Sequence, residues 1–187
     1  MIRRFALVAA LATAVAGCAT SKPTIAPVDS VDLKRFMGDW YVIAHIPSKQ
    51  ERDAYDAVES YRLDADGRIR TTYTQRKGSF TAPVETMEPV GTVVEGTNNA
   101  VWGMQFVWPI KAEYVIVDLA PDYSRTIIGR SKRDYVWLMA RTPQLPEPEL
   151  EAAVARIKAL GYDTSKLRMV PQSVRAANAD RKRSGGA

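Results

Sequence analysis

The chain has little of the chemistry that most often builds reactive or cross-linked sites. Its 187 residues include one cysteine, Cys18, and one histidine, His45. A lone cysteine cannot close an internal disulfide, and with a single histidine it cannot supply the usual ligands of a metal site. No serine stands in the G-x-S-x-G pattern of a hydrolase nucleophile. The sequence therefore predicts no catalytic residues, no metal and no other cofactor.

A strong charge of one sign is also missing from the body of the chain. The formal net charge is +5, but it comes from two arginines near the start and several bases between 175 and 183. The middle is close to neutral and carries no basic stripe, which argues against a nucleic-acid partner. Residues 173–187 are small, polar and basic, and we expect a disordered tail that can touch anionic lipid.

The apolar run at the start is too short to span a bilayer, which takes about 20 residues. Two arginines precede the run Phe5 to Val15, and Ala16-Gly17 follow it. A basic start, a short apolar stretch and small residues are typical of an export signal that is removed. We therefore expect residues 1–17 to be a signal peptide.

The cysteine that follows this signal is a candidate lipid anchor. The small residues before Cys18 resemble the lipobox of bacterial lipoproteins, which implies cleavage before Cys18, a diacylglycerol on its sulfur and an acyl chain such as palmitate on its amine. The next residue is Ala19, where an aspartate would resemble an inner-membrane retention signal. The chain is therefore expected at the outer membrane, lipid-anchored and facing the periplasm. Residues 18–31 are predicted to tether the lipid to a domain over 32–172.

Short strand-like runs fill the region between Gly38 and Arg141, with turn residues between them. Asp66-Gly67 is a hairpin signal. Eight strands joined by consecutive hairpins predict an all-β fold, an antiparallel up-and-down barrel that can hold one small ligand. The expected strands are Asp39–Ile46, Ala54–Leu63, Ile69–Arg76, Val84–Glu95, Ala100–Val107, Tyr114–Leu119, Arg125–Ser131 and Tyr135–Ala140.

One helix is predicted after the barrel, over Glu147–Leu160. Its apolar residues recur at helical spacing and form one stripe, which we expect to pack on the outside of the barrel. Gly161 is placed to end the helix. A short strand over Lys166–Val170 is then expected at the edge of the sheet.

Alternation along the strands predicts which side chains enter the barrel. Many of them are large and apolar, and a few polar groups are mixed among them, as in small-molecule pockets. A buried Glu59 is costly unless it is paired or protonated, so we expect it to contact the polar end of a ligand or to lie near the mouth. The predicted ligand-binding residues are Glu59, Tyr61, Tyr73, Trp102, Met104, Phe106, Trp108, Tyr114, Trp137 and Met139.

Three short motifs carry a resemblance to the lipocalins. Gly38 and Trp40 resemble the G-x-W motif of the first strand, Asp122-Tyr123-Ser124 resembles the second motif, and Arg141 resembles the arginine of the third. The runs around Tyr114–Leu119 and Arg133–Pro143 resemble bacterial outer-membrane lipocalins of the Blc type. That group is similar to apolipoprotein D and to plant temperature-induced lipocalins. The resemblance implies structural roles for Gly38, Trp40, Tyr123 and Arg141, with the arginine packed across the tryptophan at the barrel floor.

The resemblance implies a membrane-anchored carrier or store for a small hydrophobic ligand, a fatty acid or a lysophospholipid. The sequence is compatible with a monomer or a homodimer. Two alternatives stay open. The inward side chains are numerous enough to fill the barrel and leave a ligand-free scaffold. Glu59 and Asp118, if close together, would form a carboxylate pair suited to acid–base catalysis.

Overall fold

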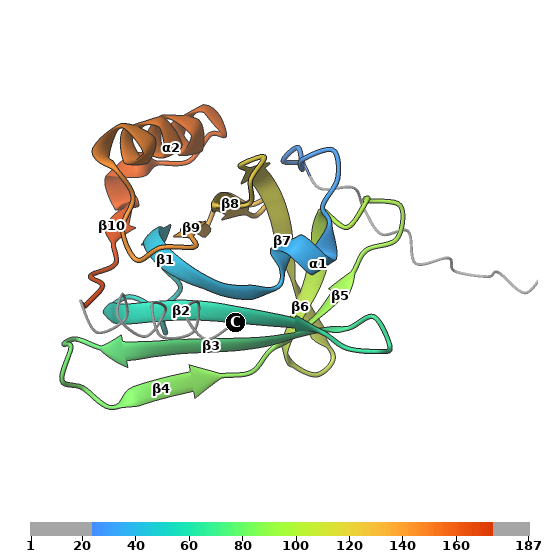
Figure 1. Ribbon diagram of the computed structural model, residues 1–187, viewed down its shortest axis with the longest axis horizontal. Coiled ribbons are helices and arrows are strands. Elements are labelled where there is room, and N and C mark those ends of the chain that lie inside the picture. Colours follow the sequence, from blue (N-terminus) through green and yellow to red (C-terminus); the bar gives the residue numbers. More distant parts are fainter. Residues whose placement is uncertain (1–23, 174–187) are drawn as a thin grey trace, which may run out of the picture.

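Hairpin-connected strands wind around a buried core in the computed structural model, which describes residues 24–173 (Figure 1). Each strand pairs antiparallel with a neighbour in the chain, and β9 pairs with β1 through Tyr41↔Ala140 to His45↔Trp137, which closes the barrel. The predicted eight-stranded antiparallel up-and-down barrel is therefore confirmed. The strands are β1 Gly38–Ile46, β2 Ala54–Leu63, β3 Ile69–Lys77, β4 Val84–Met87, β5 Val90–Val93, β6 Val101–Val107, β7 Ile110–Leu119, β8 Arg125–Gly129 and β9 Val136–Ala140.

The predicted fourth strand is in fact two strands, because Glu88-Pro89 interrupts it. Proline has no backbone N–H to give to a sheet. Beyond this break β5 pairs with both β3 and β6, whereas β4, within the described part of the chain, pairs with β3 alone. In Figure 1, β4 lies beside β3 and away from β6. The barrel wall is therefore incomplete near its open end, between β4 and β6.

The end of the barrel that precedes β1 is closed by a short helix that the sequence did not reveal, α1 Leu33–Phe36. The chain before it, residues 24–31, packs on the barrel wall: Ile25 and Val31 are buried, and Val28 N donates to Ile116 O at 2.9 Å. The described part of the predicted tether is thus part of the folded domain. The signal peptide, Cys18 and the residues after 173 lie outside the described chain.

The predicted outer helix is confirmed as α2 Glu147–Ala159. Its Ala153 and Ile157 are buried against outward side chains of the barrel such as Val115. Gly161, with φ +90°, follows the helix in the left-handed conformation that glycine adopts freely. No helix within residues 24–173 is long and apolar enough to cross a membrane.

The last described residues complete the wall between β1 and β2. After a single 3₁₀ turn, η1 Thr164–Lys166, strand β10 Arg168–Met169 pairs with β1. Further on, Gln172 Nε2 donates to Val42 O at 2.9 Å and to Ala57 O at 3.0 Å. The C-terminal segment is therefore hydrogen-bonded to both strands at once.

Candidate ligand-binding site

The closed end of the barrel is held by an arginine against a tryptophan. The guanidinium carbon of Arg141 lies 3.7 Å from the centre of a Trp40 ring, a cation–π distance. Arg141 donates to Asp39 O at 2.8 Å and to Phe36 O at 3.0 Å, and Trp40 Nε1 donates to Phe36 O at 2.8 Å. Burial lowers the pKa of Arg141 to about 10, so the side chain stays charged at neutral pH. Gly38, with φ +93°, leaves room for the Arg141 guanidinium 3.4 Å from the position that a Cβ would take.

Tyr123 joins the same closed end. Its backbone is left-handed, with φ 63°, and its hydroxyl accepts a hydrogen bond from Asp32 N at 2.9 Å. The guanidinium carbon of Arg35 lies 4.0 Å from its ring centre. The three motifs found in the sequence therefore meet in space around the floor of the barrel.

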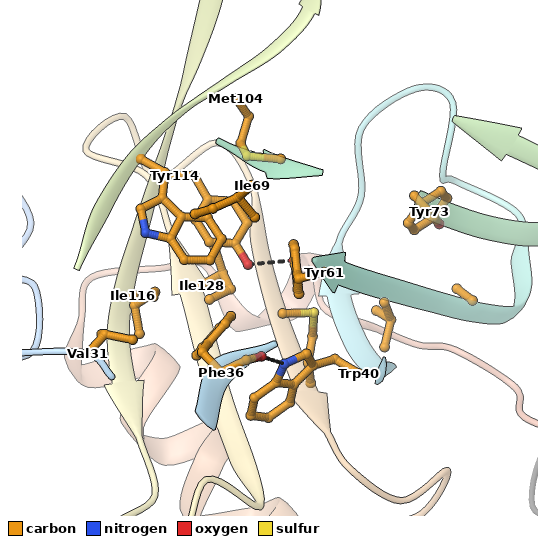
Figure 2. Packing of buried hydrophobic residues seen from close by; sticks show 14 of the residues in the cluster. Val31, Phe36, Trp40, Tyr61, Ile69, Tyr73, Met104, Tyr114, Ile116 and Ile128 are labelled. Atoms are coloured by element: carbon orange, nitrogen blue, oxygen red, sulfur yellow. Dashed lines mark hydrogen bonds between the residues drawn. The ribbon is translucent and has the colours of Figure 1, made fainter. Parts of the chain in front are cut away.

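Aromatic rings fill the barrel directly above this floor. Trp102 stacks on Tyr114 with ring centres 4.9 Å apart, and Phe36 and Tyr61 meet Trp102 edge to face at 5.3 and 5.6 Å. Trp102 is fully buried, and its Nε1 donates to Asn99 O at 2.7 Å. Figure 2 shows this group with the hydrogen bond between Tyr61 and Tyr114, and Tyr73 lies apart from it. The lower half of the barrel is therefore packed solid.

Glu59 lies at the top of this aromatic group and is 7% exposed. The Tyr61 hydroxyl donates to its carboxyl group, and the Tyr61 and Tyr114 oxygens are 2.6 Å apart. Burial, with a smaller effect of the negative charge on Glu51, raises the pKa of Glu59 to about 8. Because burial disfavours the charged form, the Glu59 carboxyl is protonated at neutral pH.

The upper half of the barrel contains polar side chains instead of packed rings. Tyr73 donates to Gln75 Oε1 at 3.0 Å, and Gln75 Nε2 donates to Gln50 O at 3.1 Å. Trp137 Nε1 donates to the buried Glu51 at 3.0 Å. These contacts connect β3 and β9 to the loop between β1 and β2 at the open end.

The buried His45 in this half has polar atoms without hydrogen-bond partners among the described residues. Both of its ring nitrogens are unpaired, and Thr71 Oγ1 is unpaired lower in the barrel, where Thr71 pairs in register with Tyr61. His45 pairs in register with Trp137, which packs on the interior cluster, so His45 also faces inward. Burial, with a smaller effect from Arg168, lowers the pKa of His45 to about 4, so it is neutral at pH 7. Buried polar atoms are seldom left without a hydrogen bond, so these nitrogens can bind a polar group of a ligand or a water molecule.

A pocket of about 400 Å³ opens at this end of the barrel, between β3, β4 and the loop after β1. Among residues 24–173 no cluster of three histidines, cysteines or acids could hold a metal ion. The pocket is lined by Gln50, Tyr73, Gln75, Lys77, Glu85, Thr86 and Met87.

Most of the predicted site residues lie inside the barrel, but they do not form one surface. Trp102, Tyr61 and Tyr114 belong to the packed lower half, and Trp137 is half-buried near the open end. The other inward residues are Glu59, Tyr73, Met104 and Met139.

Two predicted site residues are not buried in the barrel. Phe106 and Trp108 are 58% and 83% exposed at the tip of the β6–β7 hairpin. The register of that hairpin shifts between Met104 and Val107, so simple alternation fails there.

Asp118, the acid that the sequence offered as a partner for Glu59, does not point into the interior. A register shift between Ile116 and Asp118 interrupts the alternation of β7. Asp118 then accepts from Arg125 at 2.9 Å and lies 3.4 Å from Arg156 of the outer helix α2. The carboxylate pair of Glu59 and Asp118, which the sequence left open, is therefore not formed.

Sequence reasoning missed three polar residues of the upper half. Gln75 lies inside the predicted strand Ile69–Arg76 and continues the inward alternation of Thr71 and Tyr73, so the same alternation would have found it. Glu51 lies in a loop, and Arg168 lies in a two-residue strand, where no periodic signal exists.

A barrel closed by aromatic rings at one end and open above a pocket at the other is the architecture of a protein that carries a small ligand inside its barrel. The lipocalin-like domain model matches residues 31–172, and the chain belongs to this family, whose members bind small hydrophobic ligands.

Relatives of full length support the assignment. The chain is 29% identical over 166 residues to temperature-induced lipocalin-1 of Arabidopsis thaliana, covering 82% of this chain and 86% of that one. It is 27% identical over 178 residues to the outer membrane lipoprotein Blc of Escherichia coli K12, covering 91% and 98%. Insecticyanin of the tobacco hornworm Manduca sexta shares the fold with a TM-score of 0.64 at 19% identity, covering 82% and 87%.

Proposed function

We propose that this protein is an outer-membrane lipoprotein that carries or stores a fatty acid or lysophospholipid in the upper half of its barrel. The lipid anchor is Cys18, and the domain faces the periplasm. The sequence before Cys18 and the similarity over 91% of the chain to a protein named as an outer membrane lipoprotein support this anchoring. We infer that the protein acts by binding and not by catalysis.

The observation that carries the proposal is the pair of unpaired ring nitrogens of the buried His45 above a filled floor. A buried polar atom without a partner is destabilising, and the polar group of a ligand can supply that partner. Around it, Met104, Met139 and Trp137 offer apolar contact. The neutral Glu59 carboxyl can share its proton with a carboxylate or phosphate oxygen of the ligand.

The packed lower half also limits the ligand. Tyr61, Trp102 and Tyr114 form the base of the site instead of its walls, so an acyl chain has to end above them. Chains that bend or extend out through the gap between β4 and β6 fit this shape better than a straight chain held along the whole barrel axis.

The test uses the exported form, residues 18–187, with Cys18→Ser so that no anchor is attached. After removal of bound lipid, we would titrate fatty acids and lysophospholipids and follow tryptophan emission. A saturable change is expected, and it should be reduced in Trp137→Phe but kept in Trp108→Phe, the matched control at the exposed tip. No response from a folded barrel would favour the ligand-free scaffold. The packed lower half of the barrel is the observation that supports this alternative.

The anchor is tested separately in cells. A palmitate analogue should label the full chain but not its Cys18→Ser variant, and labelling of both would overturn the assignment of Cys18.

A further inference from the structure

Large apolar side chains gather on the outside of the open end. Of the seven exposed large hydrophobic residues in the described chain, only Met169 lies elsewhere. Monomeric proteins seldom leave such side chains in water without a partner. The six at the open end are Phe80 (44%), Val84 (53%), Phe106 (58%), Val107 (69%), Trp108 (83%) and Ile110 (70%).

These residues occupy two hairpins of the same rim. In an up-and-down barrel, alternate loops lie at one end, which here comprises residues 47–53, 78–83, 107–110 and 130–135. Phe80 and Val84 belong to the β3–β4 hairpin, and the other four form the tip of β6–β7. They flank the gap between β4 and β6, so the apolar tips border the entrance to the pocket.

The described chain begins beside this rim. Thr24 N donates to Ser131 Oγ at 2.9 Å, and Ser131 N and Oγ donate to the Glu113 carboxylate at 2.6 and 2.8 Å. Glu113 is three residues from Ile110, so the tip rises about 10 Å above this point. Five residues lie between Cys18 and Thr24, so the two residues can be at most about 20 Å apart. A lipid on Cys18 therefore has to enter a membrane close to the rim.

The charges at the rim suit an anionic bilayer. More exposed bases than exposed acids border the apolar tips, and bases close to a membrane are attracted to anionic head groups. The bases are Lys49, Arg52, Lys77, Lys111 and Lys132, and the acids are Asp53, Glu85 and Asp134.

We propose that the open end of the barrel docks on the bilayer that holds the lipid anchor, with the tip Val107–Ile110 inserted among the head groups. Tryptophan and aliphatic side chains suit this interfacial depth. The pocket then faces the membrane, and a hydrophobic ligand passes between the two without crossing water. The transfer of a ligand rests on the proposed lipid-binding function, but the docking itself needs no ligand in the barrel.

The test measures binding of unanchored protein, residues 18–187 with Cys18→Ser, to vesicles of phosphatidylethanolamine and phosphatidylglycerol. Cosedimentation measures how the protein partitions between the vesicles and solution. The blue shift of tryptophan emission and its quenching by bromolipid report on Trp108. Trp40 and Trp102 are fully buried and Trp137 is half-buried, so they contribute little to the shift. Trp108→Ser with Ile110→Ser is expected to weaken the partition at least tenfold, because each removes a large apolar side chain from the interface.

Met169→Ser is the matched control, because Met169 is 49% exposed on the outer wall opposite Ala44. It should change the partition less than twofold. Equal partition of the double variant and the wild type, or no binding by either, would overturn the docking. A concentration-dependent dimer that the double variant loses would also overturn it and assign the tip to a second copy of the chain.

The same samples separate this proposal from the proposed function. The double variant should bind fatty acid in solution as the wild type does. Vesicle binding without any ligand response would leave the docking standing and remove the carrier function, whereas the opposite result would remove the docking alone.

Discussion

The closed half and the open half of the barrel differ in how their polar groups are satisfied. At the closed end, Arg141, Trp40 and Trp102 all donate to backbone carbonyl groups, and the rings between them are packed face to edge. At the open end, His45 is buried with both ring nitrogens unpaired. The closed half therefore stabilises the fold, whereas the open half keeps polar atoms unpaired at a cost in stability, and a bound ligand would reduce that cost.

The most direct test of this difference between the halves is to remove one tryptophan from each of them and to compare the losses of stability. Trp102→Ala should lower the free energy of unfolding by about 3–5 kcal/mol, because it empties a fully buried site among three other rings. Trp108→Ala, at a residue that is 83% exposed, should change it by less than about 0.5 kcal/mol. Urea unfolding followed by circular dichroism measures both values. Similar losses in the two variants would contradict the division into halves.

A second prediction concerns the pH dependence that Glu59 confers on the open half. Its pKa is raised from 4.5 to about 8 in the folded state, so the folded protein holds a proton that the unfolded chain releases. The free energy of unfolding of the ligand-free protein should therefore fall as pH rises from about 4.5 to about 8, by a few kcal/mol at most.

Glu59→Gln should remove this fall, because glutamine has no proton to lose. Unfolding titrations across that pH range measure the slope, with the exposed Glu88→Gln as the control that keeps it. A slope that survives in Glu59→Gln would assign the pH dependence to another group.

A smaller effect is expected from the hydrogen bonds that hold the rim. Gln75 donates to Gln50 O at 3.1 Å and to Glu85 at 3.2 Å. Gln75→Ala should cost about 1–2 kcal/mol and speed amide hydrogen exchange in loop 47–53 without changing exchange at the floor. Thr74→Ala, at the next position on the other face of β3, is the control. Faster exchange at both ends of the barrel would mean that the halves are not independent.

The sequence revealed the fold well wherever alternation and turn signals agree. Strand β2 matches its expected bounds, because its alternation is regular from Ala57 onward and Asp66-Gly67 forms the turn that follows it. Three features escaped this reasoning for physical reasons. Helix α1 is too short for a periodic pattern, Pro89 was not recognised as a break inside an apolar run, and residues 24–31 pack on β7 through contacts distant in sequence.

The site was predictable only in part, because alternation holds just as far as the pairing stays in register. Trp102 and Met104 are inside as expected, whereas beyond the shift after Met104 both Phe106 and Trp108 are exposed. The shift at Asp118 removed an acid from the interior in the same way. The filled lower half depends on ring geometry among Phe36, Tyr61 and Trp102, which a strand-by-strand reading does not contain.

The position of the C-terminal segment has a consequence for how the protein is made. Ser173 N donates to Asp56 Oδ1 at 2.6 Å, and Gln172 joins β1 to β2. More than a hundred residues separate Gln172 and Ser173 from these partners in the sequence. Gln172 and Ser173 follow all the described strands in the chain. A ribosome or export channel therefore releases this segment after β1 and β2, and the wall between these two strands gains its last hydrogen bonds only then. Closure by such distant contacts is slow, which leaves a chain time to cross a membrane before it folds.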